Sequence, residues 1–124
     1  MRVLLSIKPE FVEKIINGTK AFEYRRVICK RKDVKTVVVY ESNPIRKVVG
    51  EFDVGEIIRD DPISLWSKTK DFSGTTSEMF FKYFANRKFG YAIKIESYKA
   101  CRKPKSLESL GAPLPPQSFR YLSD

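Results

Sequence analysis

The chain has 124 residues, of which 24 are basic and 15 acidic, so its formal net charge is +9. A chain of this length is expected to form a single domain spanning 1–124, because two separate cores would each bury too little apolar surface. No apolar run approaches the roughly 20 residues that cross a bilayer, and the N-terminal residues do not have the pattern of a signal peptide. We therefore expect a cytoplasmic protein with no membrane partner.

The basic residues are unevenly distributed along the chain. Residues 1–50 hold 12 lysines and arginines against 5 acidic residues, whereas residues 51–124 hold 12 against 10. A one-sided basic surplus favours binding to a polyanion such as RNA, because neutralised phosphates release their counterions. The alternative is that the charge serves solubility alone.

The chain contains no histidine, which narrows the chemistry available to it. Ser-His-Asp and Cys-His mechanisms and the common zinc sites with histidine ligands are excluded. The two cysteines, Cys29 and Cys101, are expected to be unpaired thiols. We predict neither a metal nor a cofactor, and any catalysis has to use Lys, Asp, Glu, Tyr, Thr, Ser or Cys.

The first half of the chain alternates strands with one helix. An apolar strand is predicted over 3–7, followed by a helix that begins at Pro9 and ends at Gly18. Strands follow over 20–27, 36–41 and 47–58. The run over 36–41 is β-branched and is expected to be buried on both faces. Gly50 and Gly55 interrupt the last strand and indicate bulges or a tight bend.

The second half begins with helical patterns. Asp61 and Pro62 open a short helix, and Thr76 is expected to cap a second helix with an apolar stripe. A strand is predicted over 89–99, then a brief helix after Pro104 and a tail that packs back onto the domain. The order of elements predicts an α+β fold, with a small, strongly bent β-barrel-like sheet and peripheral helices.

The segment NGTKAFEYRR, residues 17–26, concentrates charges and aromatic residues behind a turn. On a regular strand Glu23 and Arg25 share one face, while Phe22, Tyr24 and Arg26 share the other. Lys20 joins Glu23 and Arg25 only if the turn after Gly18 is unfinished at Lys20. The three side chains would then offer a carboxylate between two cations to one ligand. The alternative is a solvated strand with surface ion pairs.

The stretch GTKAFEYR matches the pattern G-x-K-x-x-E-x-R, and in this respect the chain resembles the ASCH domain family. The preceding LLSIKPEF and the later VVVYESNPIRKVVGEFDVGEI are similar to the family's first strand and central strand pair. The resemblance thins over 60–88. It implies a PUA-like β-barrel whose cleft binds RNA or nucleotides. It further implies that Gly18 shapes the turn, that Lys20, Glu23 and Arg25 line the cleft, and that Lys8 lies near it.

Further basic residues follow the motif. We expect these to form an exposed rim that attracts phosphates without reading sequence: Arg26, Lys30, Arg31, Lys32 and Lys35.

Near the C-terminus, Ser118 and Arg120 alternate with Phe119 and Tyr121. This pairing suits stacking on a base and holding a phosphate. It equally suits a tail that clasps the domain. Trp66 is likewise open to two interpretations, as a core residue or as a base-stacking platform.

The leading hypothesis is a monomeric module with a basic cleft that binds RNA or a nucleotide-like ligand and has a regulatory role in RNA metabolism. A second hypothesis is a small amidohydrolase acting on an N4-acylated cytidine-type nucleoside, with Lys20 and Glu23 as the acid/base pair. One enzymatic branch of the family suggests it, but that branch has threonine where this chain has Glu23. We also expect Glu23 to hold Lys20 charged, which would weaken it as a base. A third hypothesis is a regulator that senses a small metabolite.

Overall fold

The computed structural model describes residues 1–111, 115–116 and 119–122, and Ser118 lies outside them. The elements follow one another along the chain with these bounds: β1 (Arg2–Ile7), α1 (Pro9–Ile16), β2 (Phe22–Arg25), β3 (Thr36–Glu41), β4 (Lys47–Asp60), α2 (Pro62–Thr69), the 3-10 turn η1 (Lys70–Phe72), α3 (Ser77–Tyr83), β5 (Gly90–Lys105), the 3-10 turn η2 (Leu107–Leu110) and β6 (Arg120–Leu122).

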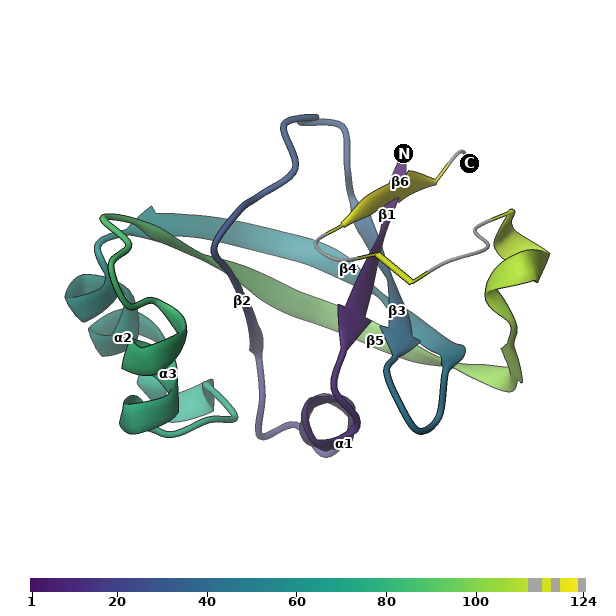
Figure 1. Cartoon of the computed structure of the whole chain (residues 1–124), viewed down its shortest axis with the longest axis horizontal. Coiled ribbons are helices and arrows are strands. Elements are labelled where there is room, and N and C mark those ends of the chain that lie inside the picture. The colour runs from purple at the N-terminus through teal and green to yellow at the C-terminus, as the bar shows by residue number, and fades with distance from the viewer. Residues whose placement is uncertain (112–114, 117–118, 123–124) are drawn as a thin grey trace.

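The strands of the described residues form one mixed sheet in the order β2-β5-β4-β3-β1-β6. β1 and β3 are parallel, and the other neighbouring strands are antiparallel. The predicted α+β class is confirmed. The sheet is not closed, however, because β2 and β6 remain as its two edges, so the fold is barrel-like at most. Its long pair, β4 and β5, crosses the whole molecule (Figure 1).

The predicted bends in β4 occur where its glycines lie. The register between β4 and β5 shifts between Val48 and Gly50 and again between Val54 and Ile57. A Cβ atom on Gly50 would lie 2.7 Å from the backbone oxygen of Lys99, so only glycine allows the two strands to approach this closely. These shifts let two long strands curve around the core.

The centre of the sheet is buried on both faces, as the β-branched pattern of β3 predicts. Val37 and Val39 pack in one cluster with the buried face of α1, and Val38 and Tyr40 pack in a second cluster on the other face. Burying each such side chain contributes about 1.5–3 kcal/mol. This double core fixes β1 and α1, which form one wall of the site described below.

Both predicted helix caps are present. A carboxylate oxygen of Asp61 accepts a hydrogen bond from the Ser64 amide at 3.2 Å, and the Thr76 hydroxyl accepts one from the Met79 amide at 3.2 Å. The helices α2 and α3 lie together at one end of the β4–β5 pair (Figure 1). Trp66 is partly buried there, with its ring centroid 4.9 Å from that of Phe80, which supports its interpretation as a packing residue.

The described part of the C-terminal segment packs back onto the sheet. β6 pairs with β1, and Leu122 is buried in the second core cluster. The Tyr121 hydroxyl accepts hydrogen bonds from the amides of Lys30 and Arg31 at 3.0 and 3.1 Å. The clasping tail is thus confirmed for these residues. Within the described chain, every helix falls short of the length and apolarity needed to cross a bilayer.

Candidate functional site

The turn between α1 and β2 sets the position of Lys20. Gly18 has a φ of +83°, and the amide of Thr19 donates to the side-chain oxygen of Asn17 at 3.0 Å. β2 begins only at Phe22, and Lys20 instead forms an isolated β-bridge with Ser73. The turn is therefore unfinished at Lys20. This was the condition under which Lys20 could join Glu23 and Arg25.

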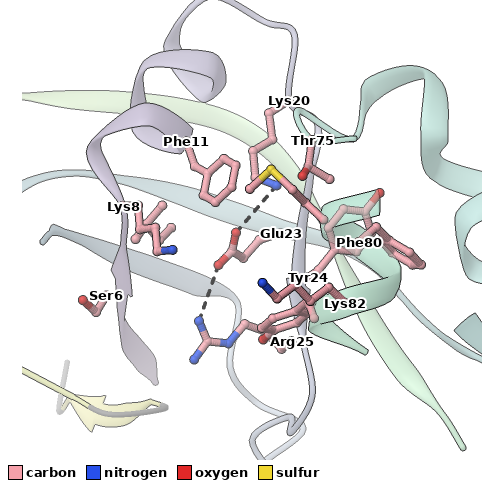
Figure 2. Close-up of a pocket in the computed structure, with 13 residues that line it drawn as sticks. Ser6, Lys8, Phe11, Lys20, Glu23, Tyr24, Arg25, Thr75, Phe80 and Lys82 are labelled. Atoms are coloured by element: carbon pink, nitrogen blue, oxygen red, sulfur yellow. Dashed lines mark hydrogen bonds and ion pairs between the residues drawn. The ribbon is translucent and has the colours of Figure 1, made fainter. Parts of the chain in front are cut away.

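A cavity of about 430 Å³ opens beside β2, and we call it the β2 pocket (Figure 2). One wall comes from the end of β1 and the start of α1, with Lys8 and Phe11. The opposite wall comes from the segment that leads into α3 and from α3 itself. The floor comes from Lys20 and β2. The complete lining is Ser6, Ile7, Lys8, Phe11, Lys20, Glu23, Tyr24, Arg25, Thr75, Met79, Phe80, Lys82 and Tyr83.

Lys20, Glu23 and Arg25 converge on this pocket and form a line of charges (Figure 2). The Lys20 Nζ lies 3.9 Å from Glu23 Oε1, and Arg25 Nη1 lies 3.5 Å from Glu23 Oε2. Lys20 and Glu23 are only 4% and 7% exposed. Both distances exceed those of tight charge-assisted hydrogen bonds. The carboxylate is therefore oriented by two cations without being saturated by them.

Lys20 is enclosed on several sides. Its Nζ donates to the backbone oxygen of Ser73 at 3.0 Å and lies 5.0 Å from the ring centroids of Phe11 and Tyr24. Burial lowers the Lys20 pKa, and Glu23 offsets this only in part. As expected, Glu23 favours the charged form of Lys20, but burial disfavours that form more strongly, so the net shift of the Lys20 pKa is downward.

Tyr24 lines the same pocket as Glu23, although strand alternation assigns it to the other face. Its ring packs edge-on against Phe80 at a centroid distance of 4.9 Å, where α3 meets the edge strand β2. The pocket wall curves around this edge. The Tyr24 hydroxyl lies 2.6 Å from the hydroxyl of Thr69, which donates to the Leu65 backbone oxygen. Burial raises the Tyr24 pKa to about 12.

Lys8 and Lys82 stand on the two walls of the pocket and are both exposed. In the described part of the chain neither forms an ion pair. Lys8 was expected near the cleft. Lys82 was not identified from the sequence, because the resemblance thins over the region that contains α3. The sequence showed only that Lys82 lies in the helix that Thr76 was predicted to cap.

The other predicted binding residues do not line the β2 pocket. Gly18 shapes the turn, and Arg120 is exposed on the edge strand β6. The Arg26 guanidinium lies over the ring of Tyr83 at 4.6 Å. Arg31 forms two hydrogen bonds to Asp33, at 2.9 and 2.7 Å.

The rim residues Arg26, Lys30, Arg31, Lys32 and Lys35 are all exposed. No group of three or more metal-ligating side chains is found among the residues that the structure describes.

The fold and the site define a small α+β domain with a pocket beside the edge strand β2. The chain belongs to the ASCH domain family, whose model matches residues 5–109. The predicted family membership is therefore confirmed.

Relatives of known sequence differ widely in size. The chain is 26% identical over 123 residues to the ASCH domain-containing ribonuclease of Zymomonas mobilis, covering 96% of this chain and 82% of the relative. It is 31% identical over 121 residues to a Ureaplasma parvum protein named ATP synthase subunit alpha, covering 97% of this chain but only 15% of that protein. It spans 29% of the length of a matching Ureaplasma parvum protein named large ribosomal subunit protein uL22.

Solved structures agree with the fold. The crystal structure of ASCH from Zymomonas mobilis superposes with a TM-score of 0.89 at 25% identity, covering 99% of this chain and 88% of that one. A tyrosine-to-phenylalanine mutant of that protein superposes with the same TM-score of 0.89 at 24% identity, covering 99% and 91%. The open mixed sheet with helices at one end is thus shared over almost the whole chain.

Proposed function

We propose that the β2 pocket binds RNA or a nucleotide-like ligand. The observation that carries this proposal is the composition of the pocket, in which four basic side chains surround one carboxylate between aromatic walls. The basic residues are Lys8, Lys20, Arg25 and Lys82, and the carboxylate is that of Glu23.

The two kinds of lining suit the two parts of a nucleotide. Aromatic and apolar side chains such as Phe11, Tyr83 and Met79 offer surfaces against which a base can stack. Lys8 and Lys82 stand at the exposed walls, where phosphates would remain in contact with water. A volume of about 430 Å³ is within the range of sites for small molecules.

The name of one relative supports the same proposal. The Zymomonas mobilis relative is named a ribonuclease, and its sequence matches this chain over 82% of its own length. A relative that acts on RNA is consistent with RNA binding here. The exposed rim of Arg26, Lys30, Arg31, Lys32 and Lys35 would add attraction that depends on salt but not on sequence.

The test is a titration of fluorescent single-stranded RNA by anisotropy at several salt concentrations. Affinity should fall steeply as salt rises. The double variant Lys8→Ala/Lys82→Ala should bind at least about tenfold more weakly, since each lost phosphate contact weakens binding of all sequences. The matched control is Lys99→Ala/Lys103→Ala, which removes two exposed charges from β5 outside the pocket. Equal losses in both variants would contradict pocket binding.

A hydrolytic activity is a second candidate, favoured by the lowered pKa of the buried Lys20. A lysine whose pKa is lowered toward neutrality is a better general base. The test is incubation of RNA, and separately of N4-acetylcytidine, with the purified protein and with Lys20→Met. Product formed only by the unmodified protein would support this candidate. Equal turnover by both proteins, or by neither, would contradict it.

A further inference from the structure

We propose that the β2 pocket recognises one unpaired guanine base through its Watson–Crick edge. This inference rests on the proposed RNA binding and names the base that the same pocket accepts. It is carried by the arrangement of Glu23 between Lys20 and Arg25 on the pocket floor (Figure 2).

The Glu23 carboxylate has capacity for further donors. Its ion-pair partners in the described chain are Lys20 at 3.9 Å and Arg25 at 3.5 Å, both longer than the about 2.7–2.9 Å of a tight charge-assisted contact. An ionised carboxylate offers about four lone-pair sites on two oxygens. A buried charge is stable only when donors satisfy it. The side chain therefore favours a ligand that brings two adjacent N–H groups.

Guanine is the base that meets this requirement. Its Watson–Crick edge presents two neighbouring donors, the N2 amino group and N1–H, followed on the N1 side by the acceptor O6. The two carboxylate oxygens of Glu23 accept from the two donors, and the neighbouring guanidinium of Arg25 donates to O6. A carboxylate beside a cation thus presents two acceptors and one donor, which complement the two donors and one acceptor of this edge.

The other three bases are disfavoured by the same geometry. Adenine and cytosine place an unprotonated ring nitrogen beside their amino group, so a lone pair would face the carboxylate. Uracil has a single N–H between two carbonyl oxygens, and each carbonyl oxygen would repel the Glu23 carboxylate. The pocket thus discriminates by leaving charged groups unpaired, which is the strongest way in which a buried polar site rejects a wrong ligand.

The walls explain why the base has to be unpaired. Phe11 lies on the α1 side of Glu23, and Tyr83 and Met79 lie on the α3 side, so a flat ring would enter between them to reach the floor. A base in a duplex has its Watson–Crick edge occupied, and recognition of that edge requires a splayed-out nucleotide. Lys8 and Lys82, on the exposed walls of the pocket, are placed to meet the flanking phosphates.

The experiment measures anisotropy at fixed salt with five RNA pentamers, each with U at both flanks and one central base: G, A, C, U or inosine. The G pentamer should bind roughly tenfold or more tightly than the A, C and U pentamers. The inosine pentamer, which lacks only the 2-amino donor, should fall between them. Glu23→Gln should abolish the preference for G, while Lys103→Ala, an exposed β5 substitution, should retain it.

Three results would overturn the inference. If the unmodified protein bound all five pentamers equally and Lys8→Ala/Lys82→Ala weakened that binding, the proposed RNA binding would stand. Guanine recognition would then be refuted. Preference for another base would refute it too. Absence of binding to any pentamer would refute the proposed function as well. The comparison of G with inosine uses the unmodified protein, so it decides the matter even if Glu23→Gln does not fold.

Discussion

At Lys20 two opposing effects act on a single ammonium group. Burial among Phe11, Tyr24 and Gly74 disfavours the charged form, while Glu23 and the backbone oxygen of Ser73 favour it. Burial is the larger effect on the pKa. A lysine in this balance is sensitive to any ligand that changes the charge beside it, so an anionic phosphate near the pocket would raise its pKa.

Tyr24→Phe tests the hydroxyl that joins the pocket floor to α2. The variant should lose about 1 kcal/mol of unfolding free energy at pH 7, because the bond to the Thr69 hydroxyl is removed. The folded pKa of about 12 lies above the ordinary value of 10.0, so between them the folded chain binds more protons than the unfolded chain. The stability supplied by Tyr24 is therefore lost as pH rises from about 10 toward 12.

The measurement is urea unfolding of both proteins at pH 7, 9 and 10.5. The margin of the unmodified protein over Tyr24→Phe should be constant up to pH 9 and smaller at pH 10.5. A margin that stays constant up to pH 10.5 would show that folding does not raise the Tyr24 pKa, and a margin that grows with pH would show that folding lowers it.

Gly74→Ala tests the packing around the Lys20 stem. Gly74 has a φ of +69°, and a Cβ atom there would lie 2.7 Å from the Cβ of Lys20. Gly111 is the matched control, since its φ is +70° and a Cβ atom added to it would meet nothing within 4 Å among the described residues. Gly111→Ala should cost about 1–2 kcal/mol from backbone strain alone. Gly74→Ala should cost roughly 1–3 kcal/mol more, from overpacking.

Chemical denaturation of the two glycine variants gives both costs directly. Equal losses would mean that the Lys20 stem moves aside freely, and the enclosed position of its ammonium would then be in doubt.

At the scale of elements, the pocket is assembled from two parts that are distant in the sequence. β1, α1 and β2 supply one wall and the floor, while the segment from Thr75 to Tyr83 supplies the other wall. Two lysines bind the residues just before this segment: Lys14 donates to the Gly74 backbone oxygen at 3.0 Å, and Lys20 donates to that of Ser73. The position of α3 therefore decides whether the cavity exists.

Thr76→Ala tests the contribution of α3 to the pocket. The substitution removes the hydroxyl that accepts from the Met79 amide, and it should cost about 1 kcal/mol of unfolding free energy. RNA affinity should fall with it, because Met79, Lys82 and Tyr83 would lose their fixed positions. Thr76→Ser retains the oxygen and should restore both properties. The readouts are urea unfolding and RNA anisotropy, and full RNA affinity in Thr76→Ala would contradict a role for α3.

The sequence predicted one half of this site and missed the other for a physical reason. Lys20, Glu23 and Arg25 lie within six residues, so the turn and strand geometry largely determines how they meet. Lys82 and Tyr83 reach the pocket only because α3 docks beside β2, and this depends on long-range packing of Phe80 against Tyr24. The predicted cap at Thr76 located the start of this helix but did not show that the helix packs beside β2.

At the scale of the whole molecule, exposed basic side chains gather in two regions. One is the β2 pocket with its rim. The other is the C-terminal half of β5, where Lys99, Arg102, Lys103 and Lys105 are exposed. This half of β5 runs away from α2 and α3 (Figure 1). A net charge of +9 alone would attract RNA to either region. Affinity by itself therefore does not identify the binding surface.

The most direct test of pocket binding is to map the amide chemical shifts of the ¹⁵N-labelled protein during titration with a short single-stranded RNA. The largest shifts should occur at residues of the β2 pocket, including Lys8, Glu23, Arg25 and Lys82. Shifts confined to Lys99, Arg102 and Lys103, with the pocket residues unchanged, would contradict binding at the β2 pocket.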